Sequence, residues 1–191
     1  MEQPGVRDPA PEPLQFVQDL VNTVDLESDR DELRTAAEAA AWARGQGLSG
    51  RHFDAGALAD VLTLREALRD VCAAHAGTDV PAATVDALDR LLARAPLRLT
   101  LDAEGRAAVR PTDGLTGAAG VTAAAAAAIA RASADGTWQR LKACAADSCR
   151  WVYYDRSPAG RSRWCTMAIC GSRAKMRTYR KNSRADAPEP G

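Results

Sequence analysis

Four cysteines near the C-terminus form two short pairs, Cys144-x4-Cys149 and Cys165-x4-Cys170, with fifteen residues between the pairs. This spacing is typical of a four-thiolate zinc site in which each pair forms one knuckle. Four protein ligands leave no open coordination position, so the single ion would be structural. A unit of about 50 residues with few large apolar groups needs such an ion to fold. The residues leave two alternatives open, namely four unligated buried cysteines or two disulfides.

The residues around the two pairs predict the architecture of this unit. Trp138–Lys142 and Arg150–Tyr154 are β-prone and flank the first pair, which predicts a hairpin with its turn at the metal. Arg156–Arg163 is a polar loop that leads to the second pair, and a helix follows it. This order predicts a zinc-ribbon or treble-clef-like finger over residues 137–184. Cys72 lies outside the pattern on an apolar helical stripe and is expected to be a small core residue.

Apolar residues recur with helical spacing along residues 14–134, which predicts a mainly α fold with a helical N-terminal domain. Thr35-x-x-Glu38 has the form of a capping box and predicts a helix that continues through Trp42. The other helices are predicted from apolar stripes at residues 16–24, 58–72 and 85–95 and from an Ala-rich run at 121–133. Leu97–Leu101 and Arg106–Arg110 alternate with period two and predict one small β-hairpin.

Both ends of the chain lack such periodicity. Residues 1–13 contain four prolines, so they are predicted to be a disordered leader, and residues 185–191 a disordered tail. The N-terminus lacks the features of a signal peptide. No apolar run approaches the ~20 residues that span a membrane. We therefore expect a cytoplasmic protein with no membrane partner.

The zero net charge hides a strong asymmetry. Residues 140–184 contain twelve Lys and Arg but only two acids, a net charge of +10, and the rest of the chain carries −10. Charge asymmetry of this kind suggests a nucleic-acid or membrane surface.

A basic helix is predicted from Ser172 to about Arg184. Arg173, Arg177, Arg180 and Arg184 fall within an arc of roughly 60° on such a helix, with Lys181 at its edge. Guanidinium groups on a rigid helix suit phosphates and guanine edges, so duplex DNA is the expected partner. Further contacts are expected from Lys175 and from two loop residues, Arg161 and Arg163.

Other residues near this helix are expected to be structural. Met176 and Tyr179 lie on an adjoining face and could pack against the finger, and Trp151 and Trp164 are expected to pack the metal unit rather than stack on bases.

Several other roles stay open for the basic residues of segment 140–184, which we call the charge run. The run could be a solvated face, could dock on the acidic N-terminal region, or could bind anionic lipid, although no apolar stripe accompanies the arginines. The finger could also be a protein-interaction or RNA-binding module, with the helical domain acting as a ligand sensor or dimerisation unit.

The C-terminal residues resemble a known family, the CGNR-type zinc finger, which is named for Cys-Gly-Asn-Arg at the fourth ligand. The resemblance rests on the cysteine spacing and on Trp151-Val-Tyr-Tyr-Asp155-Arg-Ser157, Arg161-Ser-Arg163-Trp164-Cys165 and Cys170-Gly171-Ser172-Arg173. Leu20-Val-Asn22-Thr23 and the Trp42 helix resemble ABATE, the helical domain that usually precedes this finger. The resemblance implies a zinc-dependent DNA-binding protein among bacterial transcription regulators.

The chain departs from this family at Ser172, where Asn is usual. Ser and Asn are both good N-caps, so Ser172 is expected to cap the basic helix, after a left-handed Gly171. If the Asn of the family instead reads a base or contacts a ligand sulfur, Ser172 changes that role.

The remaining sequence shows no catalytic motif. It has no Gly-x-Ser-x-Gly, P-loop, Rossmann fingerprint or His-Glu-x-x-His, and His52 and His75 have no partnered nucleophile. An enzyme is therefore not expected. The helical domain is expected to supply a homodimer contact or to bind a small-molecule effector.

Overall fold

The computed structural model describes residues 7–185, with side chains through residue 180. It confirms the mainly α fold, since six α-helices account for most of the described regular structure. The helices are α1 Leu14–Val21, α2 Ala36–Gly45, α3 Ala55–Ala74, α4 Ala82–Leu92, α5 Gly117–Ala134 and α6 Ser172–Ala185. The strands are β1 Val24–Asp25, β2 Arg30–Asp31, β3 Leu97–Leu101, β4 Ala107–Pro111, β5 Leu141–Ala143 and β6 Val152–Tyr154. Two short helical turns, η1 Trp138–Arg140 and η2 Met167–Gly171, complete the chain.

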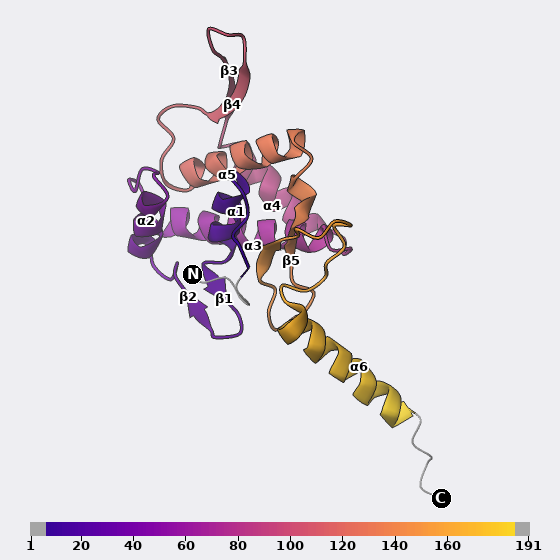
Figure 1. Cartoon of the computed structure of the whole chain (residues 1–191). Coiled ribbons are helices and arrows are strands. Elements are labelled where there is room, and N and C mark those ends of the chain that lie inside the picture. The colour runs from indigo at the N-terminus through magenta and orange to yellow at the C-terminus, as the bar shows by residue number, and fades with distance from the viewer. Residues whose placement is uncertain (1–6, 186–191) are drawn as a thin grey trace, which may run out of the picture.

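Helix α3 is the axis of the helical domain, and α1, α2, α4 and α5 pack against it (Figure 1). Local signals set the helix starts. The predicted capping box is confirmed, because Thr35 Oγ1 accepts from the Glu38 amide at 3.2 Å and Glu38 accepts from the Thr35 amide at 2.9 Å. Asp54 caps α3 by accepting from the Ala57 amide. Cys72 is fully buried on the core face of α3, as expected.

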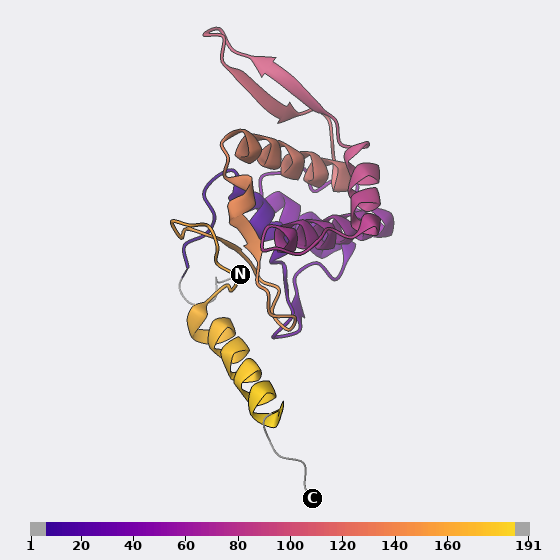
Figure 2. The same cartoon turned by 90° about the vertical axis from the view of Figure 1, so that its right-hand side faces the viewer.

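The predicted hairpin is formed by β3 and β4, which pair antiparallel with Leu99 opposite Val109. It projects from one end of the molecule, while α6 projects from the other (Figures 1 and 2). A further short hairpin, β1–β2, was not predicted. The stripe that reaches Val24 in sequence ends earlier in the structure, because α1 stops at Val21 and Val24 is in β1.

The β5–β6 hairpin belongs to two cores at once. Its register pairs Leu141 with Tyr154 and Ala143 with Val152, and these four side chains are buried in the core of the helical domain. Side chains alternate between the faces of a strand, so Tyr153 points to the opposite face, where it joins the buried cluster that contains the four cysteines. The finger therefore completes the helical core. The predicted strand over residues 138–142 is shorter than expected, because η1 replaces its first half.

Buried polar side chains attach β6 to the helical domain. The Asn22 amide lies against Val152 and forms two hydrogen bonds with its backbone, one donated to the carbonyl at 2.8 Å and one accepted from the N–H at 2.9 Å. Gln18 donates to the same carbonyl. Arg69, whose side chain is 0% exposed, donates to the carbonyls of Val21 and Arg150. These groups act as a neighbouring strand would, and they fix the finger on α1 and α3.

Single residues within 7–13 of the predicted leader contact the finger and the helical core, and residues 1–6 lie outside the described part. Arg7 donates to the carbonyls of Tyr154 and Trp164 and lies 4.7 Å above the centre of the Tyr153 ring. Ala10 is buried and its amide donates to Gln18. The proline-rich composition concealed these contacts because they are made by single residues. Most of the predicted tail, residues 186–191, lies outside the described residues.

By length and composition alone, α5 is the one described helix that could cross a membrane, with a mean hydropathy of 1.2 over its 18 residues. Its buried side chains include Val121, Ala125 and Ala128, which pack in the core between α1, α3 and α4.

We predict that Asn22→Leu destabilises the chain by about 2 kcal/mol, because it leaves the buried Val152 N–H without a partner. Urea unfolding of the zinc-loaded protein measures this change. Gln139→Leu, at an exposed amide in η1, is the control and is expected to change stability by less than about 0.5 kcal/mol. Equal stability of the two variants would contradict the proposed role of Asn22.

Candidate metal centre

The four predicted ligands come together although they lie in different elements. Cys144 follows β5, Cys149 lies in the turn before β6, Cys165 follows a long loop, and Cys170 is in η2. All four are buried, and their sulfur atoms lie within 4.8 Å of one another. The sulfurs of Cys149 and Cys165 are 3.7 Å apart, and those of Cys165 and Cys170 are 3.6 Å apart. Zn–S bonds of ~2.3 Å in a tetrahedron place sulfurs about 3.8 Å apart, so the cluster fits one zinc ion.

The five cysteines of the chain are free thiols in the structure, so the disulfide alternative is not what the geometry shows. Hydrogen bonding from Cys149, and then from Cys165, lowers the pKa of Cys144 well below the ordinary thiol value. Hydrogen bonding to Cys144 raises the pKa of Cys149 and of Cys165 above the ordinary thiol value. Four sulfurs this close resist carrying four negative charges unless a cation compensates them, and a divalent ion supplies that compensation.

Backbone hydrogen bonds hold the two knuckles together. The Cys144 amide donates to the Trp151 carbonyl at 2.9 Å, which closes the first knuckle. Arg150, between Cys149 and Trp151, has a left-handed φ of 49° and turns the chain back into β6. The Ala145 amide donates to the Arg163 carbonyl at 2.9 Å and joins the first knuckle to the loop that carries Cys165. The metal would therefore tighten a cluster that the backbone already positions.

The prediction that Ser172 caps the basic helix is wrong. The helical turn begins earlier, at Met167, and Thr166 is its N-cap, with its hydroxyl accepting from the Ile169 amide at 3.2 Å. Ser172 is already helical and its hydroxyl donates to the Met167 carbonyl at 3.1 Å. The fourth ligand therefore lies inside the helical start, and the wide turn of η2 brings its sulfur to the other three.

Gly171 lies in a tight contact and does not have a left-handed backbone. It is buried, and a Cβ placed there would lie 2.7 Å from the sulfur of Met167 and 3.3 Å from Cδ1 of Trp164. Trp164 packs on the cysteine cluster and Trp151 is buried within it, so both tryptophans are structural, as expected.

A buried ion pair organises the loop before Cys165. Asp155, 0% exposed, accepts from Lys142 Nζ at 3.1 Å and from the amides of Ser157 and Ser162 at 3.0 and 2.8 Å. Burial raises the pKa of Asp155, but these hydrogen bonds lower it more, so it lies well below its ordinary value. Lys142 also donates to the Gly160 carbonyl. Neither residue was proposed from the sequence as a site residue, although Asp155 belongs to the aromatic-Asp-x-Ser run.

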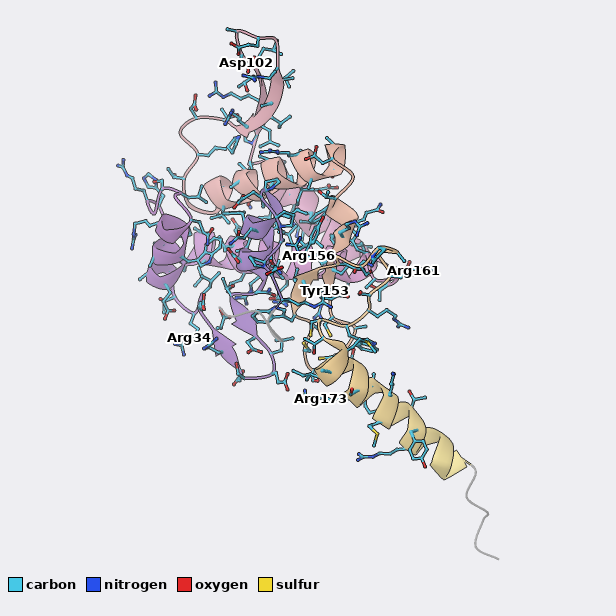
Figure 3. All side chains as sticks on the ribbon, viewed as in Figure 1. Arg34, Asp102, Tyr153, Arg156, Arg161 and Arg173 are labelled. Atoms are coloured by element: carbon cyan, nitrogen blue, oxygen red, sulfur yellow. The ribbon has the colours of Figure 1, made fainter. Side chains whose placement is uncertain are left out.

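The predicted DNA-contacting residues lie on two surfaces. Arg173, Lys175, Arg177 and Arg180 are exposed on α6, whereas Arg161 and Arg163 are exposed on the loop. Figure 3 shows Arg173 at the base of α6 and Arg161 on the border of the body. Lys175 lies on the opposite side of α6 from Arg173, where it lines a shallow hollow with Trp164 and Tyr179. The side chains of Lys181 and Arg184 lie outside the described residues.

The structure also shows what these side chains contact. Met176 and Tyr179 are 52% and 68% exposed, so the finger covers less than half of each residue, and Tyr179 borders the hollow that Trp164 lines. The described part of α6 is exposed on nearly every side because it extends beyond the metal unit. Its one ion pair among the described residues joins Arg173 to Glu27, in the turn between β1 and β2. Docking of the whole basic run on the acidic region is therefore not seen.

Two family models match the chain. The model described as "CGNR zinc finger" matches residues 140–183. The ABATE model, described as "Putative stress-induced transcription regulator", matches residues 14–136. Both matches, and their order, agree with the resemblance seen in the sequence. No curated protein matches the chain.

We predict that Cys165→Ser lowers the zinc content of the purified protein from one ion per chain to nearly none, because a three-thiolate site loses most of its affinity. Elemental analysis after extensive dialysis measures this. Cys72→Ala, at the cysteine in the helical core, is the matched control and should keep one zinc. A full zinc content in Cys165→Ser would show that the ligand set is wrong.

We also predict that Asp155→Asn costs about 3 kcal/mol at pH 7, because it leaves the ammonium group of Lys142 buried without its counter-charge. Urea unfolding with zinc present measures the change, and Asp147→Asn at the exposed tip of the first knuckle is the control. Adding Lys142→Met to Asp155→Asn should recover part of the loss. If the double variant is as unstable as the sum of the single variants, the two side chains do not interact.

Proposed function

We propose that this chain, which belongs to the ABATE family and ends in a CGNR zinc finger, is a zinc-dependent DNA-binding regulator of transcription. The observation that carries the proposal is that α6 is exposed and basic. It starts beside the four-cysteine cluster and extends away from the body (Figure 2). The proposed activity is binding and not catalysis, and it implies that the protein acts in the cytoplasm.

The dimensions of α6 support this proposal. Its 14 residues make a helix about 21 Å long, and the major groove of B-DNA is wide enough to admit a helix. Arg173, Arg177 and Arg180 are spaced to lie on one face of it. Guanidinium groups form bidentate contacts with phosphates and with guanine. Because Cys170 lies in the turn that starts the helix, the zinc site would fix the direction in which these arginines point.

The charge distribution supports the same surface. The segment that contains α6 carries +10 and the rest of the chain −10. Phosphates would be repelled by most of the body and attracted to the finger, which would orient the chain during encounter. Arg161 and Arg163 would then contact phosphates beside the groove that α6 enters.

One observation favours a second function, a protein-interaction module. Large apolar side chains are exposed along η2 and α6, where Met167 is 55% exposed, Met176 52% and Tyr179 68%. Flexible Met side chains suit a surface that adapts to a protein partner. Such a partner would be bound with little dependence on salt, whereas DNA binding by arginines would weaken steeply as salt is added.

The experiment that separates these functions is selection of the zinc-loaded chain against random duplex DNA, followed by affinity measurements on the recovered sites over a salt series. Enrichment of one motif with a steep salt slope supports a sequence-specific regulator, and a palindromic motif would indicate a dimer. Absence of enrichment, with no binding at physiological salt, would favour the protein-interaction function.

We predict that Arg177→Ala weakens DNA binding by about fivefold at low salt and lowers the magnitude of the salt slope by about 1, because one phosphate contact is lost. Fluorescence anisotropy with a labelled duplex measures both quantities. Arg98→Ala, on the β3–β4 hairpin at the opposite end of the molecule, is the control of equal charge change and should leave both unchanged. Equal effects of the two variants would show that only net charge matters.

We predict that Glu27→Gln strengthens DNA binding by about threefold at low salt. The Glu27 carboxylate pairs with Arg173 and would have to leave that arginine, and then lie near phosphate, when α6 binds DNA. Glu104→Gln, on the distant β3–β4 hairpin, removes the same charge and serves as control. If Glu27→Gln weakens binding, the ion pair positions Arg173 for DNA and does not compete with it.

A further inference from the structure

A cavity of about 190 Å³ lies inside the helical domain, away from the metal centre. It is lined by residues of α3, α4 and α5 and by Trp138 of η1, and one end of it is open to the surface. Its walls include Leu64, Leu68, Leu88, Ala126, Ile129 and Trp138. None of these residues has a part in the proposed DNA surface.

The chemistry of the walls is almost entirely apolar. Among the described residues of the walls, polar side-chain groups are limited to the indole N–H of Trp138 and the hydroxyl of Thr122, which already donates to the Ala118 carbonyl at 2.8 Å. None of the described residues that line the cavity is charged. Walls of this kind offer water few hydrogen-bond partners, so the buried end of the cavity favours apolar molecules over water. A charged molecule would lose its hydration there and gain no counter-charge.

Size and access narrow the class of ligand. An apolar protein cavity of about 150 Å³ binds benzene, so this slightly larger one has room for one aromatic ring with a small alkyl group. Its rim is reachable from outside, because Leu92 is 41% exposed and Leu88 and Ala126 are half-buried. The interior residues Leu64 and Leu68 are at most 3% exposed. The cavity is therefore a site with a buried end and an open end.

Trp138 links this cavity to the rest of the fold. Its ring meets the ring of His75 edge to face, with the ring centres 4.9 Å apart, and His75 Nδ1 lies 2.8 Å from the Leu141 carbonyl. Burial lowers the pKa of His75, so the ring is neutral near pH 7 and donates from Nδ1 to that carbonyl. Trp138 also leads directly into β5. A ligand against Trp138 would therefore change the surroundings of an aromatic ring that can report binding.

We propose that this cavity is a binding site for a small, uncharged, apolar molecule, of the size of a monocyclic aromatic hydrocarbon. The proposal does not rest on DNA binding, and its test contains no DNA.

Toluene is the probe, and the zinc-loaded chain is labelled with 5-fluorotryptophan, which gives one ¹⁹F resonance for each of the four tryptophans. Trp138→Phe assigns the reporting resonance. We expect this resonance to shift saturably with a dissociation constant below about 1 mM. The resonance of Trp42, which packs on Phe16, should stay in place. Benzoate, which has the same ring and a charge, should give no saturable shift.

Two variants on α5 complete the test. Ala126→Leu places three more carbon atoms at the half-buried edge of the cavity and should weaken toluene binding at least about tenfold. Ala127→Leu adds the same atoms to a neighbouring residue that does not line the cavity, and should leave the affinity within about twofold. The proposal is overturned if toluene gives no saturable shift of the Trp138 resonance, if benzoate binds as well as toluene, or if Ala126→Leu binds toluene as the parent does.

Discussion

The β5–β6 hairpin is shared between two cores, and the placement of the C-terminal region depends on this sharing. One face of the hairpin contributes Leu141, Val152 and Tyr154 to the helical core, and the other contributes Tyr153 to the cysteine cluster. Asn22 and Arg69 supply the hydrogen bonds that a third strand would otherwise supply. A finger held in this way cannot rotate against the helical domain without exposing apolar side chains and leaving buried polar groups unpaired.

The direction of α6 follows from the same arrangement. Cys170 lies in the turn that starts this helix, so a zinc ion bound by the four thiolates joins the helix to the hairpin through Cys144 and Cys149. Asp155 and Lys142 hold the intervening loop, and Gly171 lets Met167 and Trp164 close over the start of the helix. Past this point α6 relies on the metal unit for its position, because its described side chains are largely exposed. A basic helix that is held at its start and exposed along the rest of its length suits binding to a long anionic partner.

The sequence predicted those features that depend on local spacing, and it missed those that depend on single distant contacts. The cysteine pairs, the Thr35 capping box and the Leu97–Leu101 hairpin each have a periodic or fixed-interval signature, and each is found in the structure. Ser172 was misassigned because a cap is inferred from where a helix is thought to begin, and the wide turn at Cys170 has no sequence signature. The contacts of Arg7 with Tyr153 and Trp164 join residues about 150 positions apart, and nothing in the leader predicts them.

Photocrosslinking of the zinc-loaded chain to a random duplex that contains 5-bromodeoxyuridine, at low salt, tests most directly whether α6 binds DNA. We expect the crosslinked peptides, identified by mass spectrometry, to come from residues 161–180, and crosslinking to be lost when the metal is removed by a chelator. Crosslinks confined to the helical domain or the β3–β4 hairpin, or crosslinks that persist without metal, would contradict the role of the zinc finger in DNA binding.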